Sequence, residues 1–376
     1  MNIRVGILTA PHIDYEQRAN TFVIRNVQIG IGFHWNQYED EEFEGSLEII
    51  HNPDGTETAV NTIDIESYLT SVISSEMSAD APLELLKAQA VIARSWVMRA
   101  IGHTSHTSFD VCADDHCQRY YGITRRNTRA IEAVKATQGQ VLIYQPLCLS
   151  ASQLNSSPTG GGQEGALICD CRYHKCCGGK TEVFETCWEG EHHPYLESVT
   201  CPYCNPTAEG GLSAKRSFSD SGRSLNFFDR SADNYHDWTV TYTAEELTQI
   251  LFQKTGIDFG TILALEPIER GVSGRINRLR VVGTKLSKEL SGELTIRQAL
   301  SPTTLYSSWF EVFSSPAGGG REGASIIIRG HGWGHGVGLC QMGAAEMAKQ
   351  GYTYQQILTF YYKNTQLWQK EDALPY

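Results

Sequence analysis

The sequence has few basic residues relative to acidic ones, and it has no long apolar run. It holds 31 Lys and Arg residues against 43 Asp and Glu residues, which gives a formal net charge of −12 at pH 7. Nonspecific binding to nucleic acid or to an anionic membrane requires a basic surface, so we expect neither partner. No stretch approaches the ~18 consecutive apolar residues of a transmembrane helix, so we expect no membrane span. A neutral or amino-sugar polymer is compatible with this charge.

The first residues also lack the features of a secretory signal peptide. The stretch MNIRVGILTAPHIDYEQ has no basic start followed by an apolar core. With 376 residues, of which 41% are hydrophobic, the chain can bury a sizeable core as one large domain or two. Composition therefore indicates a globular protein.

The segment from Asn61 to Ala100 predicts two helices that meet at an elbow. The first helix has an apolar stripe at helical spacing, formed by Ile65, Tyr68, Leu69, Val72 and Ile73. For the second, Ser78 and Asp80 are N-cap candidates and Pro82 suits the first turn. Glu76 then lies in the last turn of the first helix. The negative end of the helix dipole disfavours a carboxylate there, so we expect a raised pKa, which suits a general acid.

Four ordered motifs resemble the SpoIID and LytB family. They are Glu76-Met77 followed by Pro82 to Arg94, DVCADDHCQRYYG at 110–122, YHKCCGGKTE at 173–182 with Trp188 and 194–196, and HGWGHGVGLCQMGA at 331–344. The resemblance spans about residues 45 to 365. It implies either lytic cleavage of peptidoglycan glycan strands from which stem peptides have been removed, as in SpoIID, or enhancement of a cell-wall amidase, as in LytB.

The resemblance also implies the site residues. Glu76 is the expected catalytic residue. Residues expected to bind substrate are Lys87, Gln89, Arg94, Gln118, Tyr173, His174, Gly178, Gly179, Trp333, His335 and Gln341. Many relatives have Tyr-His-Ser-x-Ser-Gly-Gly where this chain has Lys175, Cys176 and Cys177 after Tyr-His, so thiols and a cation replace hydroxyls at the expected groove. Substrate preference is expected to differ accordingly.

The chain has eleven cysteines, of which ten lie between residues 112 and 204 and Cys340 lies alone near the end. His106, Cys112, His116 and Cys117 lie within one short stretch, and tetrahedral zinc accepts such a mixed set of ligands. Some relatives hold zinc beside the catalytic cleft, so we expect a structural zinc ion here as the only cofactor, with disulfides or free thiols as the open alternatives. We expect no organic cofactor.

A second group combines Cys169-x-Cys171 with Cys201-Pro-Tyr-Cys204. The latter has zinc-knuckle spacing, but the paired Cys-x-Cys half is less typical of zinc sites. We therefore expect disulfides in this group, with structural zinc as the alternative. We do not expect thioredoxin-like redox chemistry, because no βαβ pattern surrounds the Cys-Pro-Tyr-Cys unit.

Glycine alternates with other residues in the motif from Gly330 to Gly338. Alternating glycines let a backbone pass close to a ligand or to a neighbouring element. Trp333 could then stack on a sugar face, and His335 could donate to a sugar hydroxyl or steer Glu76. Tight packing of the strand is the alternative interpretation.

Patterns along the chain predict an α+β fold with mixed sheets, a central two-helix elbow that carries the active site, and an accessory lobe. Asn-Pro-Asp-Gly at 52–55 predicts a hairpin turn. The expected domains are a β-rich segment at 1–55, a catalytic core with cysteine-rich loops at 56–204, an accessory lobe at 205–300, and a C-terminal part at 301–376 that completes the core.

We find one candidate catalytic carboxylate, whereas ordinary glycosidases need two. The interpretation that fits is a lytic transglycosylase, in which Glu76 acts first as acid and then as base while the sugar's own 6-hydroxyl closes a 1,6-anhydro ring. Two alternatives stay open: a glycan-binding enhancer of a cell-wall amidase, and a metal-dependent amidase that uses the His and Cys loop. Each implies an extracytoplasmic location, periplasmic or at the cell wall, so we expect the native leader or anchor to lie outside this sequence.

Overall fold

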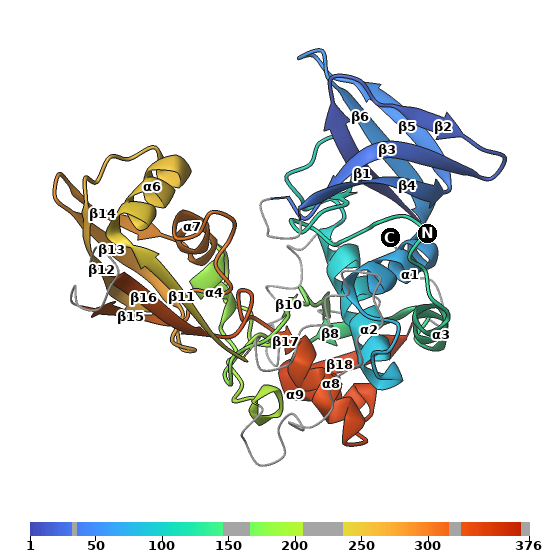
Figure 1. Cartoon of the computed structure of the whole chain (residues 1–376). Helices are drawn as coiled ribbons and strands as arrows, with labels where there is room; N and C mark the ends of the chain where they lie inside the picture. The colour runs from blue at the N-terminus through green and yellow to red at the C-terminus, as the bar shows by residue number, and fades with distance from the viewer. Residues whose placement is uncertain (32–35, 146–165, 206–235, 316–324, 370–376) are drawn as a thin grey trace, which may run out of the picture.

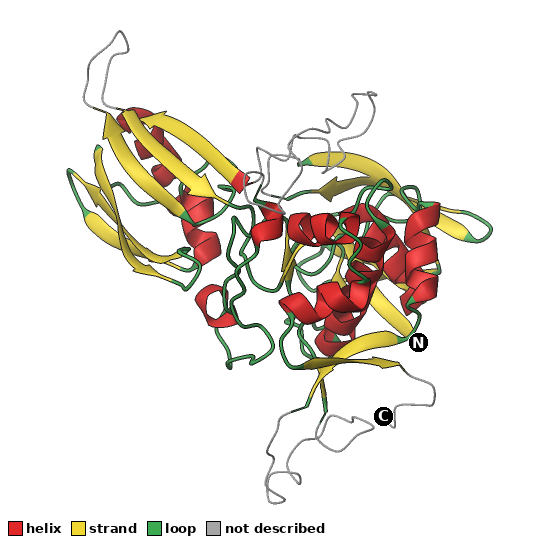
Figure 2. Cartoon of the chain, turned by 90° about the horizontal axis from the view of Figure 1, so that it is seen from below, coloured by secondary structure: helices red, strands yellow, loops and turns green. Residues whose placement is uncertain are grey.

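The chain folds into helices and several small sheets, which confirms the predicted α+β class. The computed structural model describes residues 1–31, 36–145, 166–205, 236–315 and 325–369. Figure 1 shows these residues as two lobes, and Figure 2 shows that most helices gather in the larger one. Within the described residues, none of the helices combines the length and the apolar character that a membrane crossing requires.

Two sheets form the N-terminal part of the larger lobe (Figure 1). One has the strand order β5-β6-β1-β7 and the other β2-β3-β4. Their bounds are β1 Asn2–Ala10, β2 Tyr15–Gln17, β3 Thr21–Ile29, β4 Gln37–Glu44, β5 Ser46–His51, β6 Glu57–Asp64 and β7 Val111–Cys112. The predicted hairpin turn joins β5 to β6, and Gly55 N donates to Asn52 O over 3.0 Å. Parallel pairing of β7 with β1 fixes Cys112 beside Gly6.

The predicted helical elbow is formed by α1 (Ile65–Glu76) and α2 (Leu83–Ala100). The side chain of Asp64 caps α1, and the predicted apolar stripe of this helix is buried. The predicted cap of α2 is wrong. Pro82 occupies the N-cap position without a side-chain bond, whereas the Ser78 hydroxyl accepts a bond from Asp80 N before the helix begins.

Helices and a third sheet surround α2. α3 (Thr128–Ala136) and α9 (Tyr354–Tyr361) contact it, as does β8 (Gln140–Tyr144). β8 pairs with β9 (Leu167–Ile168) and β18 (Thr365–Gln369), and α8 (Gln341–Lys349) contacts both α2 and α9. α2, α3, α8, α9 and β8 share one hydrophobic cluster with α1 and the N-terminal strands. The end of α1 is therefore supported from several sides.

A two-stranded parallel ribbon joins distant parts of the sequence. It consists of β10 (Tyr173–His174) and β17 (Leu339–Cys340). Two short elements follow β10 in the chain, α4 (Phe184–Cys187) and the 3₁₀ helix η1 (Pro202–Cys204). The ribbon brings the third and fourth sequence motifs together.

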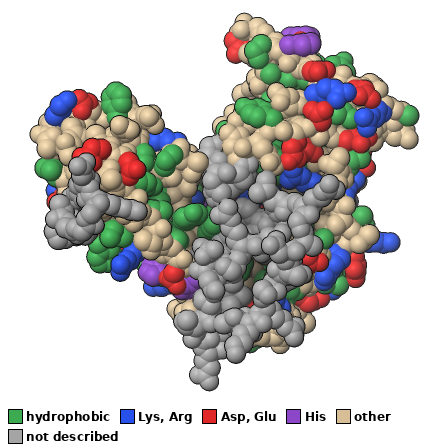
Figure 3. Space-filling model, viewed as in Figure 1, with side chains coloured by type: hydrophobic (Ala, Val, Ile, Leu, Met, Phe, Trp, Pro, Cys, Tyr) green, Lys and Arg blue, Asp and Glu red, His purple; other side chains and the backbone are tan. Residues whose placement is uncertain are grey.

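The smaller lobe has its own hydrophobic cluster. Its elements are β11 Asp237–Thr243, α6 Ala244–Thr255, β12 Ile262–Arg270, β13 Ile276–Gly283, β14 Ser287–Ser291, α7 Glu293–Ala299, β15 Phe310–Ser315 and β16 Ser325–His331. They form the sheets β11-β16-β15 and β12-β13-β14. Because Phe310, Ile326 and Ile328 belong to this cluster, it reaches past the predicted limit of residue 300. The space-filling view shows a notch between the two lobes (Figure 3).

Glu182 ties the smaller lobe to the larger one. Its fully buried carboxylate accepts bonds from Ser273 Oγ over 2.6 Å and from the backbone amides of Val272 and Ser273, each over 3.1 Å. Bonds of this kind are strong because the acceptor is charged. They fix the turn between β12 and β13 against the segment that follows β10.

Candidate active site

The carboxyl group of Glu76 lies where α1 ends and meets two other segments. Its Oε1 accepts a hydrogen bond from Tyr173 Oη over 3.2 Å and one from Arg119 N over 3.4 Å. Tyr173 comes from β10, and Arg119 follows the cysteine loop. Three of the four sequence motifs therefore converge on one partly exposed carboxyl group.

The pKa of Glu76 is raised, as the sequence predicted, but the main cause differs from the expected one. Burial of the carboxyl raises its pKa, the charge of Arg119 opposes this, and Asp115 adds to the rise. The hydrogen bonds from Arg119 N and Tyr173 also oppose it, because they stabilise the carboxylate. The group is thus biased toward the protonated form while donors are ready to stabilise its anion.

Asp115 is a second carboxylate near Glu76, but it is held in an ion pair with Arg119. It accepts a bond from Arg119 Nε over 2.5 Å in an i,i+4 ion pair. Although burial opposes ionisation of the guanidinium, the charges of Asp115 and Glu76 raise the pKa of Arg119 above its usual value. Arg119 therefore stays a cation between the two carboxyl groups.

Tyr173 is held in place through its backbone by His335. His335 Nε2 lies 2.9 Å from Tyr173 O, while its Nδ1 accepts a bond from Val337 N over 3.0 Å. Burial, together with the charge of His174, lowers the pKa of His335 well below its usual range, which keeps the ring neutral with the proton on Nε2. The predicted direct action of His335 on Glu76 is thus replaced by an indirect one through Tyr173.

The glycine-rich motif packs closely against the stretch that follows β10. Trp333 and Cys176 exchange backbone bonds, 2.7 Å from Trp333 N and 3.1 Å from Cys176 N. Gly178 has φ +77°, and a Cβ there would lie 2.9 Å from Gly332 N. Gly338 has φ +72°, and a Cβ there would lie 2.0 Å from Arg172 O. Close backbone packing therefore accounts for these glycines, as the alternative interpretation predicted.

Three of the residues expected to bind substrate lie in the interior. Arg94 is 1% exposed and donates to Glu66 near the start of α1, with Nη2 to Oε2 at 2.6 Å. Glu66 and Glu76 are ten residues apart on one helix, about 15 Å. Gln118 bonds to the Tyr68 hydroxyl, and Gln89 is 0% exposed. The prediction that these side chains line the groove is wrong, because burial in the core removes them from substrate.

Lys87 is engaged with neighbours on α2 and α9. Its Nζ lies 2.7 Å from Glu84 Oε1 and over the ring of Tyr354, 5.9 Å from the centroid. Glu84 also accepts a bond from Tyr354 N over 2.8 Å. This network anchors α9 to the start of α2, which gives Lys87 a structural role without any substrate.

Other predicted residues are also buried. His174 donates from Nδ1 to Val337 O over 3.1 Å, and its Nε2 has no hydrogen-bond partner among the described residues. Gln341 opens α8 and is 3% exposed. Lys175, Cys176 and Cys177 are at most 4% exposed, so the predicted thiols at the groove lie inside the protein instead.

Trp333 borders a cavity that is separate from the Glu76 contacts. The cavity has a volume of about 440 Å³ and is lined by Asp237, Trp238, Thr239, Tyr306, Arg329, Gly330, His331 and Trp333. The ring of Trp333 packs on Tyr306 with centroids 4.6 Å apart and is 7% exposed. Glu76 and Tyr173 are not among the lining residues, so a sugar held at Trp333 would lie outside the immediate surroundings of Glu76.

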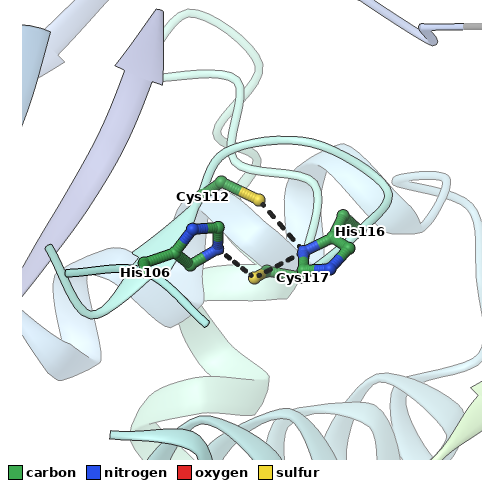
Figure 4. A group of neighbouring side chains, drawn as sticks. All are labelled: His106, Cys112, His116 and Cys117. Atoms are coloured by element: carbon green, nitrogen blue, oxygen red, sulfur yellow. Dashed lines mark hydrogen bonds between the residues drawn. The ribbon is translucent and has the colours of Figure 1, made fainter. Parts of the chain in front are cut away.

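The four predicted loop ligands do come together (Figure 4). One donor atom from each of His106, Cys112, His116 and Cys117 lies within 4.8 Å of the other three. Cys117 Sγ is 3.4 Å from His106 Nε2 and 3.5 Å from His116 Nδ1. This donor set and spacing fit a tetrahedral zinc ion. Cys117 precedes Arg119 by two residues, so the loop also positions the Arg119 amide at Glu76.

The predicted second cysteine group is wrong in its membership. Cys201 and Cys204 gather with Cys177 and Cys340, not with Cys169 and Cys171. None of the ten cysteines in the described part of the chain forms a disulfide, which differs from the disulfides expected for this group. Cys148 lies outside the described residues.

Sequence reasoning missed Arg119 and the partners of the Cys-Pro-Tyr-Cys unit. Arg119 directly follows Gln118 inside a motif that was recognised, so its position was the available signal. Cys177 and Cys340 are 163 residues apart, and only the pairing of β10 with β17 brings them together. Local spacing carries no information about such a partner.

Comparison with known proteins gives matches over most of the chain. The model of the family described as "Stage II sporulation protein" matches residues 53–144, and a "Domain of unknown function (DUF8618)" matches residues 182–338. An uncharacterized protein of Brachyspira hyodysenteriae is 29% identical over 87% of this chain and 72% of its own length. Stage II sporulation protein D of Bacillus subtilis is 26% identical over 82% of this chain and 76% of its own length.

The amidase enhancer of Bacillus subtilis is 26% identical over 80% of this chain. The match covers 40% of that longer relative. The matched stretch at 53–144 contains α1, α2, Glu76 and the His and Cys loop.

Proposed function

The chain belongs to the SpoIID and LytB family, and from this premise we propose that it is a lytic transglycosylase of peptidoglycan. Its substrate is the glycan strand without stem peptides, and its product carries a 1,6-anhydro-N-acetylmuramic acid end. The observation that carries the proposal is the carboxyl group of Glu76, with its raised pKa and its bonds from Tyr173 and Arg119 N. A substrate in the bacterial cell wall implies action outside the cytoplasm.

The reaction begins with Glu76 protonated. It donates its proton to the oxygen that links N-acetylmuramic acid to N-acetylglucosamine, and the bond from that oxygen to C1 of the muramic acid breaks. The carboxylate left behind then takes the proton of the 6-hydroxyl while that oxygen bonds to C1. The proton thus returns to Glu76, no water is consumed, and one carboxyl group serves both steps.

Tyr173 and Arg119 assist the charged form of Glu76. Both donate to Oε1, so we propose that Oε2 carries the transferred proton. Burial keeps the pKa of the Tyr173 hydroxyl well above its usual value, so the hydroxyl keeps its proton and remains a donor. Donors already in place cost no reorganisation when the charge appears.

His106, Cys112, His116 and Cys117 would hold a zinc ion that shapes the loop. When bound, the ion supplies structural cross-linking and not chemistry on the substrate. The loop residues themselves present Arg119 N and Asp115 at the site. The role of this loop is therefore one of positioning.

Mass spectrometry of glycan strands, with and without stem peptides, tests the proposal. We expect anhydromuramic ends from the wild type, and a rate about 10²- to 10⁴-fold lower from Glu76→Gln, because the acid and base are lost. Glu132→Gln on the exposed face of α3 is the matched control and should cleave normally. Equal cleavage by Glu76→Gln and the wild type would contradict the proposed role of Glu76.

A second candidate function is enhancement of a cell-wall amidase by glycan binding. The similarity to an amidase enhancer over 80% of this chain favours it. In that case Glu76 would only accept a hydrogen bond from the glycan. Intact strands that remain bound to both the wild type and Glu76→Gln, together with faster peptide release by an added amidase, would support this function over cleavage.

A further inference from the structure

Four buried cysteines from three separate segments meet behind the ribbon of β10 and β17. Cys177 follows β10, Cys201 directly precedes η1, Cys204 ends η1, and Cys340 ends β17. All four are 0% exposed, and their sulfur atoms lie within 4.8 Å of one another. None of them takes part in the contacts of Glu76 or in the loop of His106 and Cys117.

The spacing of the sulfurs fits one tetrahedral metal ion. Zinc binds thiolates at roughly 2.3 Å, so sulfurs at the corners of a tetrahedron are roughly 3.8 Å apart. The Sγ atoms of Cys177 and Cys204 are 3.3 Å apart, too far for the roughly 2.05 Å bond of a disulfide. An iron–sulfur cluster spaces its cysteine sulfurs more widely than a single ion does, so this group is too tight for one.

Backbone amides point at these sulfurs. Cys177 N and Gly343 N both donate to Cys340 Sγ over 3.3 Å, and Gly179 N donates to Cys177 Sγ over 3.4 Å. Cys340 is also the N-cap of α8, where the positive end of the helix dipole favours a thiolate. Donors around the sulfurs are typical of the surroundings of metal-bound thiolates.

We propose that Cys177, Cys201, Cys204 and Cys340 bind one zinc ion in a closed four-thiolate site. Four protein ligands complete a tetrahedron and leave no open position, so the ion is structural. It cross-links the segment after β10, the η1 turn and the start of α8. The proposal is independent of the proposed glycan chemistry, since it rests on the geometry of the sulfurs and their donors.

Metal analysis of the 376-residue chain, purified without chelators from zinc-supplemented medium, tests the site. The Cys117→Ser variant is used as background, so that the His and Cys loop contributes less to the count. Adding Cys204→Ser should lower the zinc content by one ion per chain. Adding Cys169→Ser, an equally buried thiol outside the group, should leave it unchanged. An equal zinc content in both double variants would overturn the proposal.

A spectroscopic measurement on the wild type covers the case in which Cys204→Ser does not fold. After replacement of zinc by ¹¹³Cd, we expect one NMR resonance in the strongly deshielded range of four sulfur ligands, distinct from the resonance of a site with two sulfurs and two nitrogens. Absence of the four-sulfur resonance would overturn the proposal. So would peptide mapping under nonreducing conditions that finds any two of these four cysteines in a disulfide.

Discussion

The hydroxyl of Tyr173 donates a hydrogen bond of 3.2 Å to Oε1 of Glu76 and so joins the β10–β17 ribbon to the end of α1. Tyr173 is positioned in turn by His335, which binds its carbonyl oxygen over 2.9 Å. The glycine-rich motif therefore acts on the candidate active site through a backbone contact. The turns of this motif place the imidazole of His335 within hydrogen-bond distance of the Tyr173 carbonyl oxygen.

Replacing Tyr173 with Phe should weaken the proposed reaction and shift its pH profile. The hydroxyl stabilises the Glu76 carboxylate, so its loss raises the pKa of Glu76 further. Activity requires the protonated acid, so the alkaline limb of kcat/KM should move to higher pH. The rate near neutral pH should fall roughly 10- to 100-fold, the worth of a bond to a charged group.

Tyr354→Phe is the matched control for that variant, because the Tyr354 hydroxyl donates to Gln140 at the start of β8 and not to Glu76. Its pH profile should match the wild type. A Tyr173→Phe variant with slower cleavage but an unmoved alkaline limb would mean that Tyr173 acts on substrate and not on Glu76.

Arg94→Met should destabilise the fold by about 3 kcal/mol without a specific effect on glycan binding. The change leaves the partly buried carboxylate of Glu66 without its ion pair. Urea unfolding gives the stability, and the double variant Arg94→Met with Glu66→Gln should recover part of the loss. If Arg94→Met had normal stability but no longer bound glycan, Arg94 would have to be a glycan-binding residue.

Glu41 in β4 should make stability depend on pH. Burial raises the pKa of this carboxyl to about 7, partly offset by the charge of Arg125. Because the folded-state pKa lies above the unfolded value of 4.5, the stabilisation from protonated Glu41 is fully present below pH 4.5 and is lost as pH rises through about 7. Stability should therefore fall between these two pH values.

Glu41→Gln removes that dependence. At pH 8 the variant should be more stable than the wild type by on the order of 1–3 kcal/mol, and at pH 4 the two should be nearly equal. Urea unfolding at pH 4, 6 and 8 measures the difference. A difference that stays constant with pH would show that Glu41 does not titrate in this range.

Removal of metal should separate the transglycosylase from a metal-dependent amidase. If zinc only shapes the loop of Cys112 and Cys117, glycan cleavage should decline with the slow loss of the Arg119 N contact to Glu76. No peptide should be released before or after chelation. Time courses of both products after addition of a chelator provide the test. Immediate loss of a peptide-releasing activity would favour the amidase.

Much of the local structure could be predicted because short-range physics decides it. The apolar stripe of Ile65 to Ile73 repeats at the helical period, and Asn52 to Gly55 has the chemistry of a tight turn. The four loop ligands were predictable for the same reason, since only eleven residues separate His106 from Cys117.

The position of a residue along α2 did not predict whether its side chain faces the groove or the core. Arg94 and Gln89 lie on the same helix as Lys87, and their side chains differ in exposure because β8, α3, α8 and α9 cover α2 from different sides. Periodicity identifies a helix face but not the element that covers it. The burial that raises the pKa of Glu76 likewise depends on Arg119 and Tyr173, which arrive from distant segments.

The sequence by itself determined the helical elbow, the hairpin and the His and Cys loop, because each depends on residues close together in the chain. Only the tertiary structure decided that Cys201 and Cys204 meet Cys177 and Cys340, and that Tyr173 meets Glu76. The parallel pairing of β10 with β17 brings Cys340 to Cys177 across more than 160 residues, and the packing of β10 against the end of α1 brings Tyr173 to Glu76 across 97. Chain topology, which no local pattern encodes, brings their side chains within bonding distance.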